Sequence, residues 1–287
     1  MGDAEFDWSD ACAQAERVRR GEVAPSELVE AAIARIQATN PTLNAVIHER
    51  FERARQEAAG DLPDGPFRGV PLLVKDLGAS SAGDPRWDGT RFLQAEAWVS
   101  DHDASVVTRF RRAGFVIVGR TNTPELGSTI TTEPLSVGPA RNPWDPSRST
   151  GGSSGGSGAA VAAGMTAVAH ASDGGGSIRI PASHNGLVGL KPARGRVSRA
   201  PDRGEGWIGG STDGALTRTV RDAAAVLDVL AGPEPGDPYA APALPGRLAD
   251  EVGKGPGKLR IGVLAHPARS DVDPDTDATD SVAASST

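Results

Sequence analysis

Three consecutive glycines followed by a serine constrain the folding of this chain more than any other feature of its sequence. The run is Gly174-Gly175-Gly176-Ser177, and it follows a strand-like segment from Met165 to Ala171. Glycines after a strand let the backbone turn sharply and expose successive N–H groups. A serine that ends such a turn and starts a helix lies where those groups and the helix dipole stabilise an oxyanion. An ordinary turn with an N-cap serine has the same pattern.

Short apolar runs alternate with helical patterns along the chain. Helices are expected at 9–20, 26–39, 51–59, 103–113, 155–163 and 219–231, and strands at 44–48, 71–74, 115–118, 165–171, 187–190 and 259–264. We expect Ser9 to cap the first helix and Asn40-Pro41 to end the second. The alternation predicts an α/β fold with a mixed, mostly parallel central sheet flanked by helices.

Composition excludes several classes of function. The 287 residues carry a net charge of -7, which argues against nucleic-acid binding and against an anionic membrane surface. The single cysteine, Cys12, excludes an internal disulfide and a Cys-rich zinc site, and no apolar run is long enough to span a membrane. The acidic N-terminus does not resemble a secretory signal, so we expect a cytoplasmic protein. We also expect no bound metal.

Lysine is rare in this chain, which uses arginine for most of its positive charge. Only four of its 30 basic residues are lysines, and Lys75 is the only one in the first 190 residues. It follows the apolar run Pro71-Leu72-Leu73-Val74. A desolvated lysine can lose its proton at neutral pH, whereas an arginine cannot. A surface lysine beside a buried strand is the ordinary interpretation, but the arginine bias favours a neutral lysine that acts as a base.

A second Gly/Ser-rich segment occupies residues 151–158 and leads directly into an Ala-rich helical pattern. It matches G-x-S-x-G around Ser153, the pattern of a nucleophile elbow, although residues 141–146 make a poor preceding strand. A flexible linker is the other interpretation. No Lys-Ser/Thr pair follows the glycines, so the segment is not a phosphate-binding Walker loop.

Together these segments resemble the amidase signature family. The resemblance includes Gly69–Asp76, the two Gly/Ser segments and the motifs at 121–125, 141–144 and 189–192. Among members of the family, the segments look most similar to those of 6-aminohexanoate cyclic-dimer hydrolases. Two residues depart mildly from the family pattern: Ser172 and Ala193 both stand where threonine is commoner.

The resemblance implies a Ser–Ser–Lys triad that hydrolyses linear or cyclic amides through an acyl-enzyme. Ser177 would be the nucleophile, Ser153 (after a cis peptide bond) the proton relay and Lys75 the base. The N–H groups of Gly174, Gly175, Gly176 and Ser177 would form the oxyanion hole, and Ser154 would orient the relay. No cofactor is implied. The expected partner is a small-molecule amide, with a homodimer as a further option.

Family members are usually longer than this chain, which bears on its domain organisation. We expect the N-terminal part of an amidase domain at 1–232, a Pro/Gly-rich linker at 233–258, a strand opening a further part at 259–270, and a disordered tail at 271–287. Two alternatives to an active amidase follow. One is an inactive truncated homologue, and the other is a serine esterase that uses Ser153 with a histidine such as His266 as base.

Overall fold

The computed structural model describes residues 8–260 and 262. Contacts within the chain divide it into two units, Met1–Val252 and Gly253–Thr287. In the second unit, residues 253–260 and 262 form no helix or strand. The strand expected at 259–264 is therefore absent at 259, 260 and 262, and its other positions lie outside the described residues, as does the expected disordered tail at 271–287.

Six strands form one mixed sheet in the order β1-β3-β2-β4-β6-β5. Their bounds are β1 Val46–Glu49, β2 Pro71–Lys75, β3 Val116–Thr121, β4 Val168–Asp173, β5 Val188–Gly189 and β6 Thr212–Thr217. β2 pairs in parallel with both β3 and β4, whereas the outer pairings are antiparallel. The predicted mixed α/β fold is confirmed, but the sheet is not mostly parallel, because three of its five strand pairings are antiparallel. Its parallel centre brings the carboxyl ends of β2 and β4 to the same edge of the sheet.

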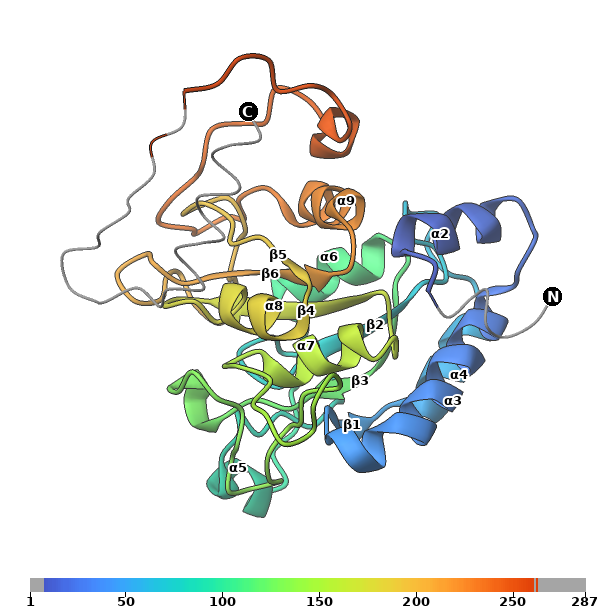
Figure 1. Cartoon of the computed structure of the whole chain (residues 1–287), viewed down its shortest axis with the longest axis vertical. Coiled ribbons are helices and arrows are strands. Elements are labelled where there is room, and N and C mark those ends of the chain that lie inside the picture. The colour runs from blue at the N-terminus through green and yellow to red at the C-terminus, as the bar shows by residue number, and fades with distance from the viewer. Residues whose placement is uncertain (1–7, 261, 263–287) are drawn as a thin grey trace. The chain divides into compact units, whose positions relative to one another are not determined.

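Helices cover both faces of this sheet (Figure 1). Their bounds are α2 Ala11–Arg19, α3 Pro25–Leu43, α4 Phe51–Ala59, α5 Arg91–Ala95, α6 Ser105–Arg112, α7 Gly155–Ala162, α8 Arg179–Asn185 and α9 Val220–Leu230, with 3-10 turns η1 Glu125–Gly127 and η2 Leu248–Glu251. On β2, Leu72 and Val74 join the apolar cluster of α6 and α9, and Leu73 joins that of α3, α4 and α7. This alternation follows the two-residue period of a strand, with a buried layer on each face.

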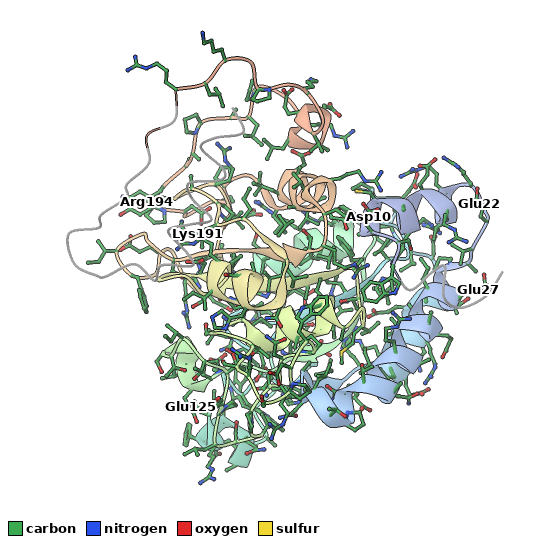
Figure 2. The ribbon with its side chains drawn as sticks, in the orientation of Figure 1. Asp10, Glu22, Glu27, Glu125, Lys191 and Arg194 are labelled. Carbon is green, nitrogen blue, oxygen red and sulfur yellow. The ribbon has the colours of Figure 1, made fainter. Side chains whose placement is uncertain are left out.

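Two helix ends differ from the predictions. The cap of α2 is Asp10 and not Ser9, because the Asp10 carboxylate accepts the N–H of Ala13 at 2.8 Å. Asp10 also pairs with Arg221 of α9, and Figure 2 places it where the two helices meet. α3 continues past Pro41 to Leu43. Burial of Leu43 favours this last turn, and the side chain of Asn40 accepts the N–H groups that follow the helix.

Besides the 3-10 turns, three elements are missing from the ranges predicted from the sequence: strand β6 and helices α5 and α8, although a helix was expected to start at Ser177. Strand β6 contains Asp213 and Gly214, which are poor strand formers, yet it pairs with β4 along its whole length and is fully buried. Helix α5 is a five-residue turn of helix capped by Thr90. The segment after α9 has little regular structure, but η2 is held against α9 because Asp228 accepts the N–H groups of Leu248 and Ala249.

Candidate active site

Lys75 is the last residue of β2, and its side chain is completely buried. Its Nζ donates hydrogen bonds to Ser153 Oγ at 2.7 Å and to Ser172 Oγ at 3.1 Å. Burial lowers the pKa of Lys75 to about 7, although Asp213 and Asp173 act in the opposite direction. The lysine is therefore poised to hold or release a proton near neutral pH, as a general base must.

The backbone of Lys75 is fixed from both sides by buried side chains. Its N–H donates to Nδ1 of His170 at 3.3 Å, and its carbonyl accepts from Arg120 Nη2 at 3.1 Å. Arg120 in turn pairs with the buried carboxylate of Asp76 at 3.0 Å. These contacts leave the ammonium end of Lys75 as the part that faces the serine hydroxyls.

A second buried chain of polar groups leads away from His170. Because Nδ1 accepts from Lys75, Nε2 carries the proton, and it lies 3.3 Å from Asp213 Oδ1. Burial opposes ionisation of Asp213, but Arg199 and His170 lower the pKa of its carboxyl to about 2. Burial lowers the pKa of His170. The histidine is therefore a neutral structural link between Lys75 and an ionised carboxylate.

Ser153 follows a cis peptide bond from Gly152 and is only 1% exposed. Its carbonyl accepts from the Thr123 hydroxyl at 3.0 Å. Gly152 has no room for a side chain, because a Cβ atom there would lie 2.4 Å from the carbonyl oxygen of Thr131. The position of the serine hydroxyl beside Lys75 thus depends on a glycine that nothing larger can replace.

The Gly174–Ser177 turn is organised by Asp173, the last residue of β4. Its carboxylate accepts the N–H of Gly176 at 2.8 Å and that of Ile178 at 3.1 Å, and it pairs with Arg179 at 2.9 Å. The Gly176 N–H, one of the four groups expected to form the oxyanion hole, is therefore engaged by Asp173 in this structure. Within the described part of the chain, no acceptor lies on the N–H groups of Gly174, Gly175 and Ser177.

Ser154 joins the two serine-bearing segments. Its N–H donates to the carbonyl of Ser177 at 3.3 Å, and its Oγ lies 3.3 Å from both the N and the O of Ser172. The structure brings Ser153 and Ser177 onto adjacent segments in this way. No hydrogen bond joins their two hydroxyl groups in the described chain, and Ser177 is half-buried whereas Ser153 is not exposed to solvent.

Comparison with known proteins agrees with this geometry. The family model described as Amidase matches residues 27–284. The chain belongs to the amidase signature family. It is 51% identical over 261 residues to the 6-aminohexanoate-cyclic-dimer hydrolase of Paenarthrobacter ureafaciens, covering 90% of this chain and 52% of that protein. It is 46% identical over 217 residues to a putative amidase, AmiC, of Mycobacterium tuberculosis, covering 75% of this chain and 45% of the relative.

Solved structures of amidases show the same fold. A 6-aminohexanoate cyclic dimer hydrolase complexed with substrate superposes with a TM-score of 0.92 at 49% identity, covering 97% of this chain and 58% of that one. A bacterial aryl acylamidase of the amidase signature family gives a TM-score of 0.75 at 35% identity, covering 82% of this chain and 50% of the other. The chain spans about half the length of the curated relatives it matches.

The geometry favours an amidase site over the elbow-type esterase. An elbow serine follows a strand, whereas residues 141–152 hold only an isolated bridge between Arg141 and Ser149. The basic group that contacts Ser153 is Lys75. His266, the base suggested for the esterase, lies outside the described residues.

Sequence reasoning missed the contribution of Ser172 and His170 to the candidate site. Ser172 accepts from Lys75 through its side chain, and His170 accepts the Lys75 backbone N–H. The two residues are separated by one position on β4 and therefore share a face of the strand. That spacing, next to Asp173 and the glycine turn, was the signal available in the sequence.

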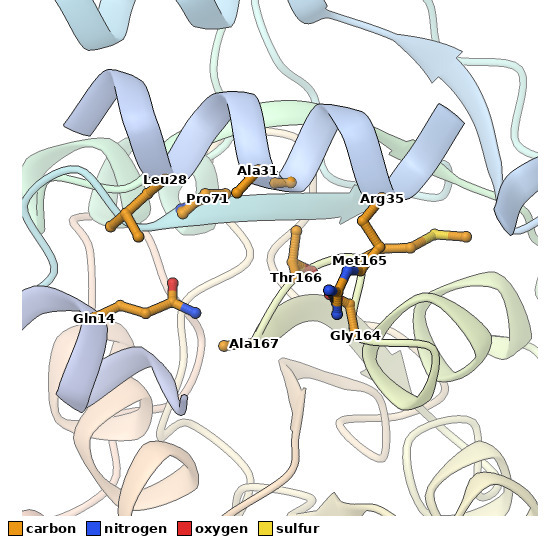
Figure 3. A pocket seen from close by; sticks show the side chains of 10 residues that line it. Gln14, Leu28, Ala31, Arg35, Pro71, Gly164, Met165, Thr166 and Ala167 are labelled. Atoms are coloured by element: carbon orange, nitrogen blue, oxygen red, sulfur yellow. Dashed lines mark hydrogen bonds between the residues drawn. The ribbon is translucent and has the colours of Figure 1, made fainter. Parts of the chain in front are cut away.

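A hollow opens at the opposite end of the sheet and holds none of the predicted site residues (Figure 3). Pro71 begins β2 there, and Thr166 and Ala167 precede β4, with Gln14 and Arg35 on its wall. Across residues 8–260 and 262, no cluster of His, Cys, Asp or Glu could hold a metal ion. Over the same residues, no helix is long and apolar enough to cross a membrane.

Proposed function

We propose that this protein hydrolyses carbon–nitrogen bonds of small linear or cyclic amides through an acyl-enzyme. The observation that carries the proposal is the hydrogen bond of 2.7 Å between a fully buried Lys75 and Ser153. A lysine whose pKa is lowered to about 7 is available as a base near neutral pH. The family membership and the adjoining glycine turn support the same reaction.

Proton transfer would proceed through the two serines. Neutral Lys75 takes the hydroxyl proton of Ser153 as Ser153 takes that of Ser177, and the Ser177 oxygen attacks the amide carbonyl. The tetrahedral intermediate collapses when the C–N bond breaks, and the leaving amine receives the proton along the reverse path. Water then attacks the acyl ester and gives a proton to the same relay. The C–O bond to Ser177 breaks, Ser177 takes that proton back from Ser153, and the acid leaves.

The Gly174–Ser177 turn would stabilise the developing negative charge. The N–H groups of Gly174, Gly175 and Ser177 are the donors we assign, because Gly176 is engaged by Asp173. Ser154 orients the relay through its contacts with Ser172 and Ser177. Donors fixed in advance by the fold stabilise an oxyanion without reorganisation at the moment of reaction.

A simple amide with an apolar acyl chain is the substrate class we propose. Relatives at 51% identity are named 6-aminohexanoate-cyclic-dimer hydrolases, and one solved neighbour carries that substrate. Those proteins are about twice as long as this chain, so parts of their substrate sites have no counterpart in the matched region. We therefore use their substrate as the first compound to assay.

Covalent labelling tests the proposal. We expect a fluorophosphonate to react with the purified chain, and mass spectrometry to place the adduct on Ser177. Ser177→Ala should remove the adduct, whereas Ser153→Ala should slow labelling strongly. An adduct on Ser153 would support the esterase instead, and a folded chain that does not react would support an inactive homologue.

A further inference from the structure

Residues 204–211 form a loop beside the Gly174–Ser177 turn. Two backbone hydrogen bonds of 3.0 Å close it, from Ser211 to Gly206 and from Gly210 to Trp207. A Cβ atom on Gly174 would lie 3.3 Å from the Trp207 ring, and one on Gly175 would lie 3.4 Å from it. The indole therefore packs against the backbone of the turn that we assign to the oxyanion hole.

The loop holds its tip in an unusual conformation. Trp207 is 71% exposed and Ile208 is 87% exposed, with φ angles of 52° and 53°. Left-handed backbone is disfavoured for residues other than glycine, and most of all for a β-branched side chain such as isoleucine. Strain of this kind is found where a binding or catalytic site requires it. Packing against the glycine turn does not by itself explain why Trp207 adopts this conformation, because most of the indole surface faces solvent.

The approach to the catalytic serines passes this indole. Lys75 and Ser153 are buried, while Gly175 is exposed and Ser177 is half-buried, so a carbonyl must arrive on the side of the turn. A Cβ atom on Gly127 would lie 3.1 Å from Ser153 Oγ, and the neighbouring Leu126 is 67% exposed. The exposed apolar side chain of Trp207 therefore lies beside the turn that a substrate carbonyl must reach.

We propose that Trp207 is a specificity-determining residue that contacts the acyl chain of the substrate and selects amides with an apolar, methylene-rich chain. This inference rests on the proposed function. An indole presents a large rigid apolar surface with little side-chain entropy to lose. Each methylene that it helps to remove from water should favour reaction by roughly threefold to fourfold.

The test uses two fluorophosphonates that differ only in the alkyl chain on phosphorus, ethyl and hexyl. The readout is the ratio of the second-order labelling rate constants, hexyl over ethyl. We expect a ratio of roughly tenfold or more in the parent chain, near unity in Trp207→Ala, and intermediate in Trp207→Phe. Trp8→Ala is the matched control, because Trp8 is also exposed, at 62%, and its ring lies against Arg218. Arg218 follows Thr217, which pairs with Val168 at the start of β4, whereas the glycine turn follows the end of β4.

The possible outcomes separate the two proposals. An unchanged ratio in Trp207→Ala would overturn the role of Trp207, whether or not the absolute rates fall. A ratio that falls equally in Trp8→Ala would also overturn it. Failure of the parent chain to react with either probe, while it melts cooperatively, would overturn the proposed function and this inference with it.

Discussion

Burial of the Lys75 side chain would destabilise the fold if its amino group had no hydrogen-bond partner. Its side chain is fully buried, and its pKa is lowered to about 7 because burial disfavours the charged form. The two hydroxyl groups of Ser153 and Ser172 accept from Nζ and keep the buried group hydrogen-bonded. An arginine would remain charged at this position, which gives a physical reason for a lysine in a chain that otherwise prefers arginine.

The pH dependence of hydrolysis follows from this lysine. Only neutral Lys75 can accept a proton, so we expect kcat/KM to fall about tenfold per pH unit below the lysine pKa, which is about 7. A pH–rate profile between pH 5 and 9 measures this. A profile that stays flat from pH 7 down to pH 5 would contradict a lysine base.

Ser172 supplies the second acceptor of Lys75, so its hydroxyl should matter more than its size. We expect Ser172→Ala to lower kcat/KM by roughly fivefold to tenfold, the worth of a lost hydrogen bond of about 1 kcal/mol. Ser172→Thr keeps the hydroxyl and serves as the matched control, with activity near that of the parent. Equal activity in the alanine and threonine variants would show that the contact of 3.1 Å has no role.

At the scale of elements, the site is assembled where strands end. Lys75 ends β2 and Asp173 ends β4, and these strands are parallel neighbours. The sequence predicted both strands and the glycine turn, because apolar runs and glycines act locally. It did not predict β6, since Asp213 and Gly214 gain their place only by pairing with β4. The contact between His170 and Lys75 was equally hidden, because it joins residues on different strands.

The loop before α7 gives a prediction at this scale. We expect Gly152→Ala to abolish labelling and to destabilise the fold by at least ~1–3 kcal/mol, because its Cβ would overlap the Thr131 carbonyl. Gly246→Ala is the matched control, since no atom lies within 4 Å of the added Cβ. Urea unfolding together with fluorophosphonate labelling measures both effects. Parent-like behaviour of Gly152→Ala would contradict the packing described around Ser153.

For the whole molecule, helices cover both faces of one sheet, with apolar residues of β2 directed alternately to each. The alternation of short apolar runs with helical patterns along the sequence predicted this layered architecture. Helix α3 shows their limit: Pro41 suggested an end that burial of Leu43 overrides. The proposed roles of Ser153 and Ser177 came from motif resemblance, and the arrangement of the hydroxyls around Lys75 depends on contacts between distant segments.

The buried lysine should make the free energy of unfolding depend on pH. A lysine whose pKa falls from 10.5 to about 7 on folding binds more protons in the unfolded chain between these values. Stability from this group therefore rises with pH across that window and is lowest below it. We expect Lys75→Met to lack this rise when urea unfolding is compared at pH 7 and pH 10. Identical pH dependence in both proteins would contradict a buried, neutral lysine.

Amide hydrolysis by Lys75→Arg is the most direct test of a lysine base acting through Ser153. Arginine keeps the positive charge and most of the length but does not deprotonate at neutral pH. Lys191→Arg is the matched control, because among the described residues Lys191 Nζ donates only to the carbonyl of Pro192. We predict that Lys75→Arg loses hydrolysis of a simple hexanoyl amide by at least about a thousandfold, whereas Lys191→Arg retains it. Substantial turnover by a folded Lys75→Arg protein would contradict the mechanism.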